Sequence, residues 1–91
     1  MAKTSEDKWF VYILRCDDDT LYTGITNDLI RRCEQHNAGT VSRYTRSRLP
    51  AVLVYQESQA SRSSALKREL AIEALTRQKK ELLIRANPQI L

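Results

Sequence analysis

Two apolar segments near the start of the chain predict a pair of β-strands. They run from Trp9 to Cys16 and from Leu21 to Thr26, and the turn-forming residues 17–20 lie between them. Polar turn residues between two apolar segments are typical of a β-hairpin. The first segment is apolar at both odd and even positions, which predicts a strand buried on both faces and therefore central in its sheet.

The remaining pattern predicts one more strand and three helices. A third strand is expected over Ala51–Gln56, where β-branched and aromatic residues follow a proline. The first helix is expected to begin near Asn27, which can cap it, and to stop before Gly39. Two further helices are expected, one from the serine cluster at 61–64 to about Leu75 and one from Thr76 to about Ala86.

Helical spacing places two polar residues together on the first helix. Leu29, Ile30 and Cys33 form its predicted inward stripe, and Arg32 and His36 share one edge of that stripe. These two side chains are therefore expected to face the same region of space.

Glu69 interrupts the apolar pattern of the second predicted helix. It falls at the centre of an arc formed by Ala65, Leu66, Leu70 and Ile72. Burying a carboxylate is costly unless the group is paired or bound to a cation. Two explanations stay open: a structural salt bridge, for example to an arginine of the first helix, and a metal ligand in a cleft.

Length and composition restrict the class of protein. The chain has 91 residues, of which 42 % are hydrophobic, so it is long enough for one domain and too short for a two-domain enzyme. No apolar run approaches the ~20 residues that cross a bilayer, and the first residues lack the features of a signal peptide. We expect a cytoplasmic protein with no membrane partner, a flexible N-terminus at 1–8, one domain at 9–87 and a C-terminal tail at 88–91.

The charge is unevenly distributed. The formal net charge is +4, but three basic and six acidic residues precede Arg31, and twelve basic and five acidic residues follow from there on. A basic region is where a phosphate-binding surface would be built, although a solvated basic loop remains open for residues 43–48. The candidate nucleic-acid contacts are Arg43, Tyr44, Arg46 and Arg48, with a second patch at Arg77, Lys79 and Lys80.

Cysteine and histidine usage limits the metal chemistry. Cys16 and Cys33 are too few for a disulfide framework and are expected to be buried free thiols. With His36 as the single histidine, a zinc site of the usual kind has too few ligands. Any metal ion would be a hard cation held by carboxylate and water.

The hairpin carries a recognisable pair of motifs. Phe10-Val11-Tyr12, followed after nine residues by Tyr22-Thr23-Gly24, resembles the paired motif of the GIY-YIG nuclease family, and more closely its small stand-alone bacterial members. Phe10 and Val11 depart from the glycine and isoleucine of the family's name. The resemblance continues through Arg32, His36 and Glu69 and covers roughly Trp9 to Leu83.

The resemblance implies both a fold and an activity. The fold would be α+β, sandwich-like, with a three-stranded antiparallel sheet flanked by helices. The activity would be hydrolysis of DNA phosphodiester bonds with one divalent ion, Mg²⁺ or Mn²⁺, in DNA repair or processing. RNA as a substrate, and a homodimer or a targeting protein partner, stay open.

The resemblance also implies roles for individual residues. Glu69 would be the metal ligand, Arg32 would hold the scissile phosphate, Tyr12 would position the phosphate or water, and Gly24 is the motif glycine. Tyr22 would be the general base or its relay, and His36 matches a catalytic histidine of some relatives. Tyr44 lies near another active-site position, whereas Asn87 lies past the place of the asparagine that many relatives use.

Two questions stay open from the residues alone. Tyrosine has a reference pKa of about 10 and is an awkward base at neutral pH, whereas histidine needs no such tuning, so the base is Tyr22 or His36. The two hairpin tyrosines share a face only if an odd number of residues connects the strands, as a three-residue turn at 17–19 would.

The alternative to an enzyme is a nucleic-acid-binding module that retains the nuclease fold without turnover. A weaker alternative is a protein-interaction domain.

Overall fold

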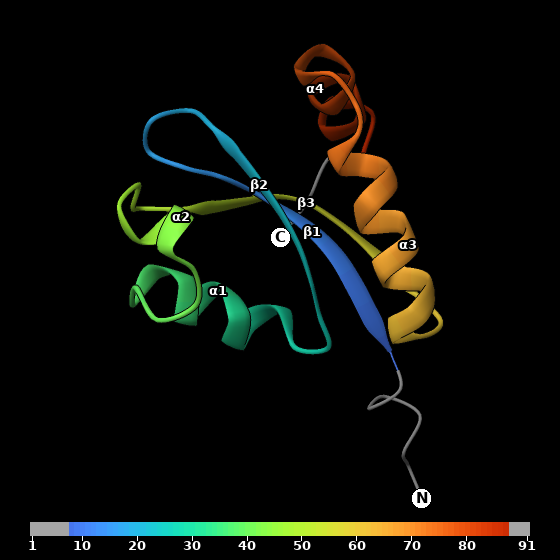
Figure 1. Cartoon of the computed structure of the whole chain (residues 1–91), viewed down its shortest axis with the longest axis horizontal. Helices are drawn as coiled ribbons and strands as arrows, with labels where there is room; N and C mark the ends of the chain where they lie inside the picture. Colours follow the sequence, from blue (N-terminus) through green and yellow to red (C-terminus); the bar gives the residue numbers. More distant parts are fainter. Residues whose placement is uncertain (1–7, 88–91) are drawn as a thin grey trace, which may run out of the picture.

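A three-stranded antiparallel sheet lies between helices in the computed structural model, which describes residues 8–87 (Figure 1). The strand order is β2-β1-β3, so the first strand is central, as predicted. The expected terminal segments lie outside the described residues, apart from Lys8. Within 8–87, no helix has the length and apolar character that a membrane span requires. The elements are β1 (Trp9–Arg15), β2 (Leu21–Thr26), α1 (Leu29–Asn37), α2 (Arg43–Arg46), β3 (Val52–Gln59), α3 (Arg62–Glu73) and α4 (Arg77–Ala86).

The turn between β1 and β2 fixes which residues share a face of the sheet. The Cys16 amide donates to the Thr20 carbonyl, and the Asp19 amide donates to the Cys16 carbonyl, each at 2.9 Å. Asp19 has φ of 69°, the left-handed residue that closes a three-residue hairpin turn. The register pairs Tyr12 with Gly24. The connection is therefore odd, and Tyr12 and Tyr22 lie on the same face, as the sequence predicts for this turn.

Alternate side chains of β1 pack into two hydrophobic cores, one on each face of the sheet. Val11 and Ile13 pack on one face, in a cluster with Ala65 and Ile72 of α3. Tyr12 and Leu14 lie on the other face, with Leu29 and Cys33 of α1 packed against them. All four strand residues are at most 1 % exposed. Figure 1 shows this arrangement, with α1 and α2 on one side of the strands and α3 on the other.

Several boundaries and faces differ from the sequence expectation. β3 continues three residues past Gln56, because it stays paired with β1 as far as Gln59, opposite Trp9. The α1 cap is Asp28 rather than Asn27, since the Asp28 side chain accepts from the Arg31 amide. Two residues expected on inward stripes are exposed, Ile30 at 75 % and Leu70 at 65 %. Both lie at the margins of their apolar arcs.

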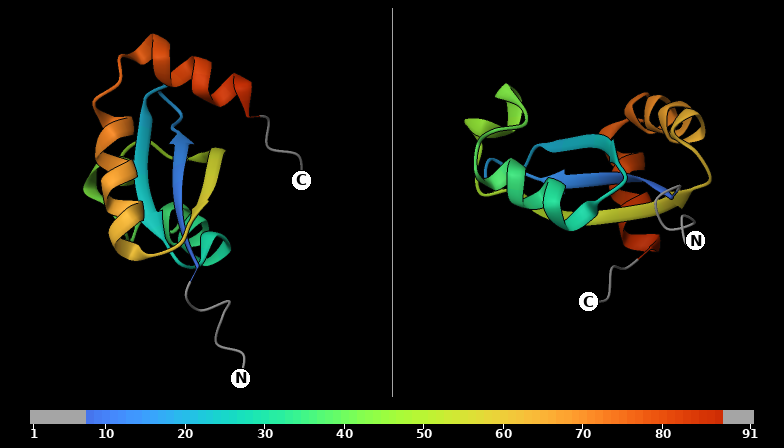
Figure 2. Two further views of the ribbon diagram at one scale, coloured as in Figure 1. Left: turned by 90° about the vertical axis from the view of Figure 1, so that its right-hand side faces the viewer. Right: turned by 90° about the horizontal axis from the view of Figure 1, so that it is seen from below.

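A network of ion pairs attaches α4 across the end of the sheet nearest the hairpin turn (Figure 2). Arg15 at the end of β1 donates to both carboxylate oxygens of Glu81, at 2.8 and 2.9 Å. Arg77 reaches both Glu81 and Asp19. Because α4 has no buried residue, these ion pairs help to orient the helix relative to the sheet.

We expect Glu81→Gln to destabilise the protein by about 1 kcal/mol at about pH 7, since the paired carboxylate is only partly exposed. Arg15 and Arg77 lower the pKa of Glu81 to about 2. A lowered folded-state pKa contributes stability above the unfolded value, and that stability is lost as the pH falls through the folded value. The difference between wild type and variant should therefore shrink as the pH falls from about 5 to about 2.

Urea unfolding at several pH values measures this difference. Glu34→Gln is the matched control, because the Glu34 side chain is exposed and makes no ion pair within residues 8–87. A Glu81→Gln penalty that is independent of pH, or no larger than that of Glu34→Gln, would contradict the role given to the network.

Candidate active site

A chain of buried hydrogen bonds links the central strand to α1 and α2. The Tyr12 hydroxyl lies 2.9 Å from Nε2 of His36, and Nδ1 of His36 lies 2.9 Å from the Thr45 hydroxyl. His36 and Thr45 are both completely buried, and Tyr12 is 1 % exposed. Each polar atom in the chain is paired, which is what burial requires.

Gly24 makes room for this chain. A Cβ atom on Gly24 would lie 2.5 Å from the Tyr12 hydroxyl oxygen and 2.6 Å from its Cζ. The two residues face each other across the β1–β2 pair, so the tyrosine ring occupies the space that a side chain at position 24 would need. Only a residue without a side chain permits this close approach.

Tyr22 and Tyr44 extend the aromatic cluster outward from His36. The Tyr22 ring centroid lies 5.0 Å from that of His36 and 6.5 Å from that of Tyr12. Tyr44 stacks on Tyr22 at 6.1 Å, and the Arg48 guanidinium lies 4.0 Å from the Tyr44 ring centroid. Within residues 8–87 the Tyr22 hydroxyl has no hydrogen-bond partner, so it is available to a bound group.

The buried pair of Tyr12 and His36 is uncharged near neutral pH. Burial and the neighbouring Tyr22 raise the pKa of Tyr12 to about 12, although Arg32 opposes this. Burial and the Arg32 charge lower the pKa of His36 from its usual value. A raised tyrosine pKa and a lowered histidine pKa both favour the neutral forms, so His36 is free to accept a proton.

Arg32 is positioned to bind an anion. Its charge acts on both Tyr12 and His36, as expected if Arg32 and His36 share one edge of α1. It lines a cavity of about 280 Å³ together with Thr26, Arg31 and Gln35. Within 8–87 it forms no ion pair, so its fork of donors can receive a phosphate.

A cleft of about 400 Å³ lies along the open edge of β2. Tyr22 and Thr23 form its floor, Tyr44 comes from α2, Glu73 from α3 and Lys80 from α4. The cleft therefore joins elements from both faces of the sheet at one edge.

Glu69 lies one helical turn before Glu73 on α3, so both carboxylates face the same way. Burial and the charge of Glu73 raise the pKa of Glu69. Glu69 is half-buried, and within 8–87 it forms no ion pair and accepts no side-chain hydrogen bond. The structural salt bridge considered from the sequence is therefore wrong within this part of the chain.

The donor set suits one type of metal ion. In the described part of the chain, no group of three or more His, Cys, Asp or Glu side chains is arranged to hold a metal. A site closed by protein ligands is thus absent there. A half-buried, unpaired carboxylate fits a Mg²⁺-like ion, which keeps several waters and takes its other ligands from substrate phosphate.

The predicted basic contacts divide into two groups. Arg48 is paired with Asp18 at 2.9 Å, and Arg77 is paired with Asp19 and Glu81, so the charges of both arginines are already balanced. The others form no ion pair within 8–87: Arg43 and Arg46 are exposed on α2, Lys79 is exposed on α4, and Lys80 lines the cleft. Within the segment 43–48, for which a solvated basic loop stayed open, residues 43–46 form the short helix α2.

Sequence reasoning missed Thr45 and Glu73. Thr45 is brought to His36 by α2, a helix of four residues, which is too short for hydrophobic periodicity to reveal. Ser42 is a recognisable N-cap for that helix, but nothing in the sequence pairs Thr45 with a distant histidine. Glu73 could have been found from its spacing of four residues to Glu69.

The two cysteines were predicted to be buried free thiols. Cys16 is buried and free, and Cys33 is free but only half-buried.

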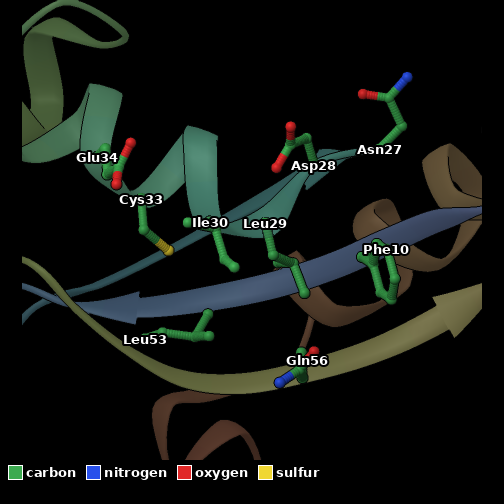
Figure 3. A pocket seen from close by; sticks show the side chains of 9 residues that line it. All are labelled: Phe10, Asn27, Asp28, Leu29, Ile30, Cys33, Glu34, Leu53 and Gln56. Atoms are coloured by element: carbon green, nitrogen blue, oxygen red, sulfur yellow. The ribbon is translucent and has the colours of Figure 1, made fainter.

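A larger cavity, of about 680 Å³, lies between α1 and the strands β1 and β3 (Figure 3). Phe10, Leu29 and Leu53 give it an apolar lining, and the carboxylates of Asp28 and Glu34 lie at its margin. Apolar walls with acidic neighbours do not suit a phosphate group, so this cavity is not the candidate active site.

The hairpin tyrosines, the glycine opposite Tyr12, the helical arginine and the half-buried glutamate together define a class of protein. Residues 8–81 match the family model described as the GIY-YIG catalytic domain, and the chain belongs to this nuclease family.

The relatives narrow the class further. A UPF0213 protein of Desulfotalea psychrophila is 49 % identical over 86 residues, covering 93 % of this chain and 78 % of the relative. A UPF0213 protein of Staphylococcus aureus is 51 % identical over 79 residues, covering 87 % and 96 %. The solution structure of a UPF0213 protein from Bacillus halodurans is 39 % identical with a TM-score of 0.57, and that of a protein from E. faecalis is 36 % identical with a TM-score of 0.60. Each covers 87 % of this chain and 84 % of the solved one, which confirms the predicted α+β fold.

We expect Gly24→Ala to destabilise the protein by about 2 kcal/mol, because the new methyl group displaces the Tyr12 ring and overpacks the site. Chemical unfolding measures this cost. In a Tyr12→Leu background the ring is gone, so the same substitution should cost much less, and the difference is the coupling between the two positions. If Gly24→Ala cost the same stability in both backgrounds, the Tyr12 ring would not be the reason that position 24 requires glycine.

Proposed function

We propose that the protein is a divalent-metal-dependent endonuclease that hydrolyses DNA phosphodiester bonds, and that it acts in DNA repair or processing in the cytoplasm. The observation that carries this proposal is the meeting of an unpaired arginine, an unpartnered tyrosine hydroxyl and a neutral buried histidine around Tyr12. Hydrolysis of a phosphodiester needs charge neutralisation, an oriented water and an acceptor for its proton, and these groups suit those needs.

Arg32 would bind the scissile phosphate. It carries no ion pair within the described residues, and its charge lies beside Tyr12 and His36. A bidentate contact from a guanidinium would neutralise charge on the phosphoryl oxygens and orient the phosphorus atom. Tyr22, with its free hydroxyl at the floor of the cleft, would donate to the same phosphate or to the attacking water.

Glu69 would hold the metal ion, and Mg²⁺ and Mn²⁺ both suit its carboxylate. Once bound, such an ion would stabilise charge on the phosphate and lower the pKa of a coordinated water. Burial and the charge of Glu73 both raise the pKa of Glu69, and a cation bound there would offset the cost of the ionised form.

The proton acceptor would be His36, acting through Tyr12. Tyr12 keeps its proton near neutral pH, since its pKa is raised to about 12, so it cannot act as a stored base. It can pass a proton on: its oxygen takes a proton from the attacking water while its own proton moves to Nε2 of His36, 2.9 Å away. The water oxygen bonds to phosphorus as the bond to the leaving oxygen breaks, and the leaving oxygen is then protonated from solvent. This favours His36 over Tyr22 as the base.

The cleft suggests how the nucleic-acid strand is held. Tyr44 and Lys80 line it beside Tyr22, and Arg43 and Arg46 are exposed on α2, the helix that carries Tyr44. Cations beside an aromatic surface suit a phosphate backbone with adjacent bases. Arg48 and Arg77 would contribute less, because acidic partners already balance their charges.

Cleavage of supercoiled plasmid, single-stranded DNA, branched DNA and RNA, with Mg²⁺ or Mn²⁺, tests the proposal. Glu69→Gln and Arg32→Ala should each reduce the cleavage rate by at least about 100-fold, and chelation should abolish cleavage. Glu69→Gln should keep DNA affinity, since it removes a negative charge from the surface that meets phosphate.

Two matched controls separate the site from general charge effects. Glu34→Gln and Arg85→Ala make the same chemical changes at exposed positions outside the cleft, and both should keep the wild-type rate. Metal-dependent nicking that survives both site variants would place the activity elsewhere. Salt-sensitive DNA binding without any cleavage would instead show a binding module that retains the fold.

A further inference from the structure

We infer that Thr45 is a positioning residue of this site: its buried hydroxyl fixes the tautomer of His36, so that Tyr12 directs its proton at His36. This inference rests on the proposed function for its catalytic consequence. The tautomer itself is a property of the folded protein that can be measured without substrate.

The inner end of the chain sets the direction of the hydrogen bonds. The Thr45 hydroxyl lies 2.9 Å from Nδ1 of His36 and 3.4 Å from the Ser42 carbonyl oxygen, to which it donates. A hydroxyl has one hydrogen to donate. The Ser42 carbonyl is an acceptor for that hydrogen, which leaves the Thr45 oxygen to accept from His36 and places the ring proton on Nδ1.

The outer end of the chain gives the same direction. Within residues 8–87 the buried Tyr12 hydroxyl has one hydrogen-bond partner, Nε2 of His36, 2.9 Å away. Its hydrogen is directed at Nε2, because the nearby Arg32 guanidinium offers only donors. Both ends thus give one order of donors, from Tyr12 through His36 to Thr45 and Ser42.

The other tautomer would block proton transfer. With the proton on Nε2, His36 would donate to Tyr12 and could not receive its proton. Within residues 8–87 the Tyr12 hydroxyl makes no other hydrogen bond, so its own hydrogen would then be left without an acceptor. A neutral His36 with its proton on Nε2 cannot accept a proton from Tyr12. The hydrogen-bond partner of Nδ1 therefore decides whether the ring can act as the acceptor.

The local fold explains how Thr45 reaches this position. Ser42 caps α2 and accepts from the Tyr44 and Thr45 amides. Arg48, just after this helix, donates to Asp18 of the hairpin turn and to the Tyr44 carbonyl. These contacts hold a four-residue helix against the end of the sheet, with Thr45 as its fully buried residue.

The test compares Thr45→Val, which keeps the shape and removes the hydroxyl, with Thr45→Ser, which keeps the hydroxyl. Two-bond proton–nitrogen correlation spectra of the His36 ring should show the Nδ1–H tautomer in wild type and in Thr45→Ser. In Thr45→Val the population should shift to Nε2–H, since Nδ1 has lost its acceptor. Thr45→Cys, whose sulfur is a weaker acceptor, should shift in the same direction and serves where Thr45→Val fails to fold.

Cleavage rates complete the test. Thr45→Val should lower kcat by about 100-fold with KM unchanged, and Thr45→Ser should stay within about 3-fold of wild type. Wild-type spectra showing Nε2–H, or an unchanged tautomer in Thr45→Val, would overturn the inference. A shifted tautomer with an unchanged kcat would overturn the positioning role alone. A wild type that cleaves no nucleic acid would overturn the proposed function and the catalytic consequence, while the spectra still decide the tautomer.

Discussion

The site depends on one close approach, that of the Tyr12 ring to the backbone of Gly24. It allows the Tyr12 hydroxyl to reach Nε2 of His36, 2.9 Å away. A buried hydroxyl and a buried imidazole without partners would each cost on the order of 1–3 kcal/mol. The pairing therefore fixes the rotation of α1 over the sheet and requires α2 to bring Thr45 to the far side of the ring. Packing and proposed chemistry are set by the same contacts.

The distribution of charge follows from the same architecture. The acidic hairpin turn is matched with arginines from later in the chain, since Asp18 binds Arg48 and Asp19 binds Arg77. These pairs hold α2 and α4 near the end of the sheet and remove two cations from the surface. Arg32 is left without an acidic partner within 8–87, beside the tyrosines. The basic residues thus fall into two groups: some form structural ion pairs, and others remain available to bind an anion.

The sequence predicted the sheet and the longer helices because their signals are local. Apolar alternation placed the central strand, the aspartate-rich turn gave the odd connection, and serine and threonine caps marked the starts of α3 and α4. Four of the candidate site residues also meet as expected, namely Tyr12, Tyr22, Arg32 and His36.

The remaining features depend on contacts between distant segments. The length of β3 is set by its pairing with β1, and α2 is too short to show a helical period. The role of Thr45 arises only when that helix meets His36. The sequence also does not show which charged residues pair across distant segments. Arg48 and Arg77 were therefore assigned to the nucleic-acid surface, although they bind aspartates of the hairpin turn.

The central claim is that a cation and a phosphate meet at the open edge of β2. Paramagnetic line broadening by Mn²⁺ in nuclear magnetic resonance spectra tests it most directly, because the broadening marks residues near the ion without any need for turnover. The account predicts broadening that is strongest at Glu69 and Glu73 of α3 and in the adjoining part of β2 around Tyr22, and its loss in Glu69→Gln. Broadening centred on the aspartates of the hairpin turn, or unchanged in Glu69→Gln, would contradict it.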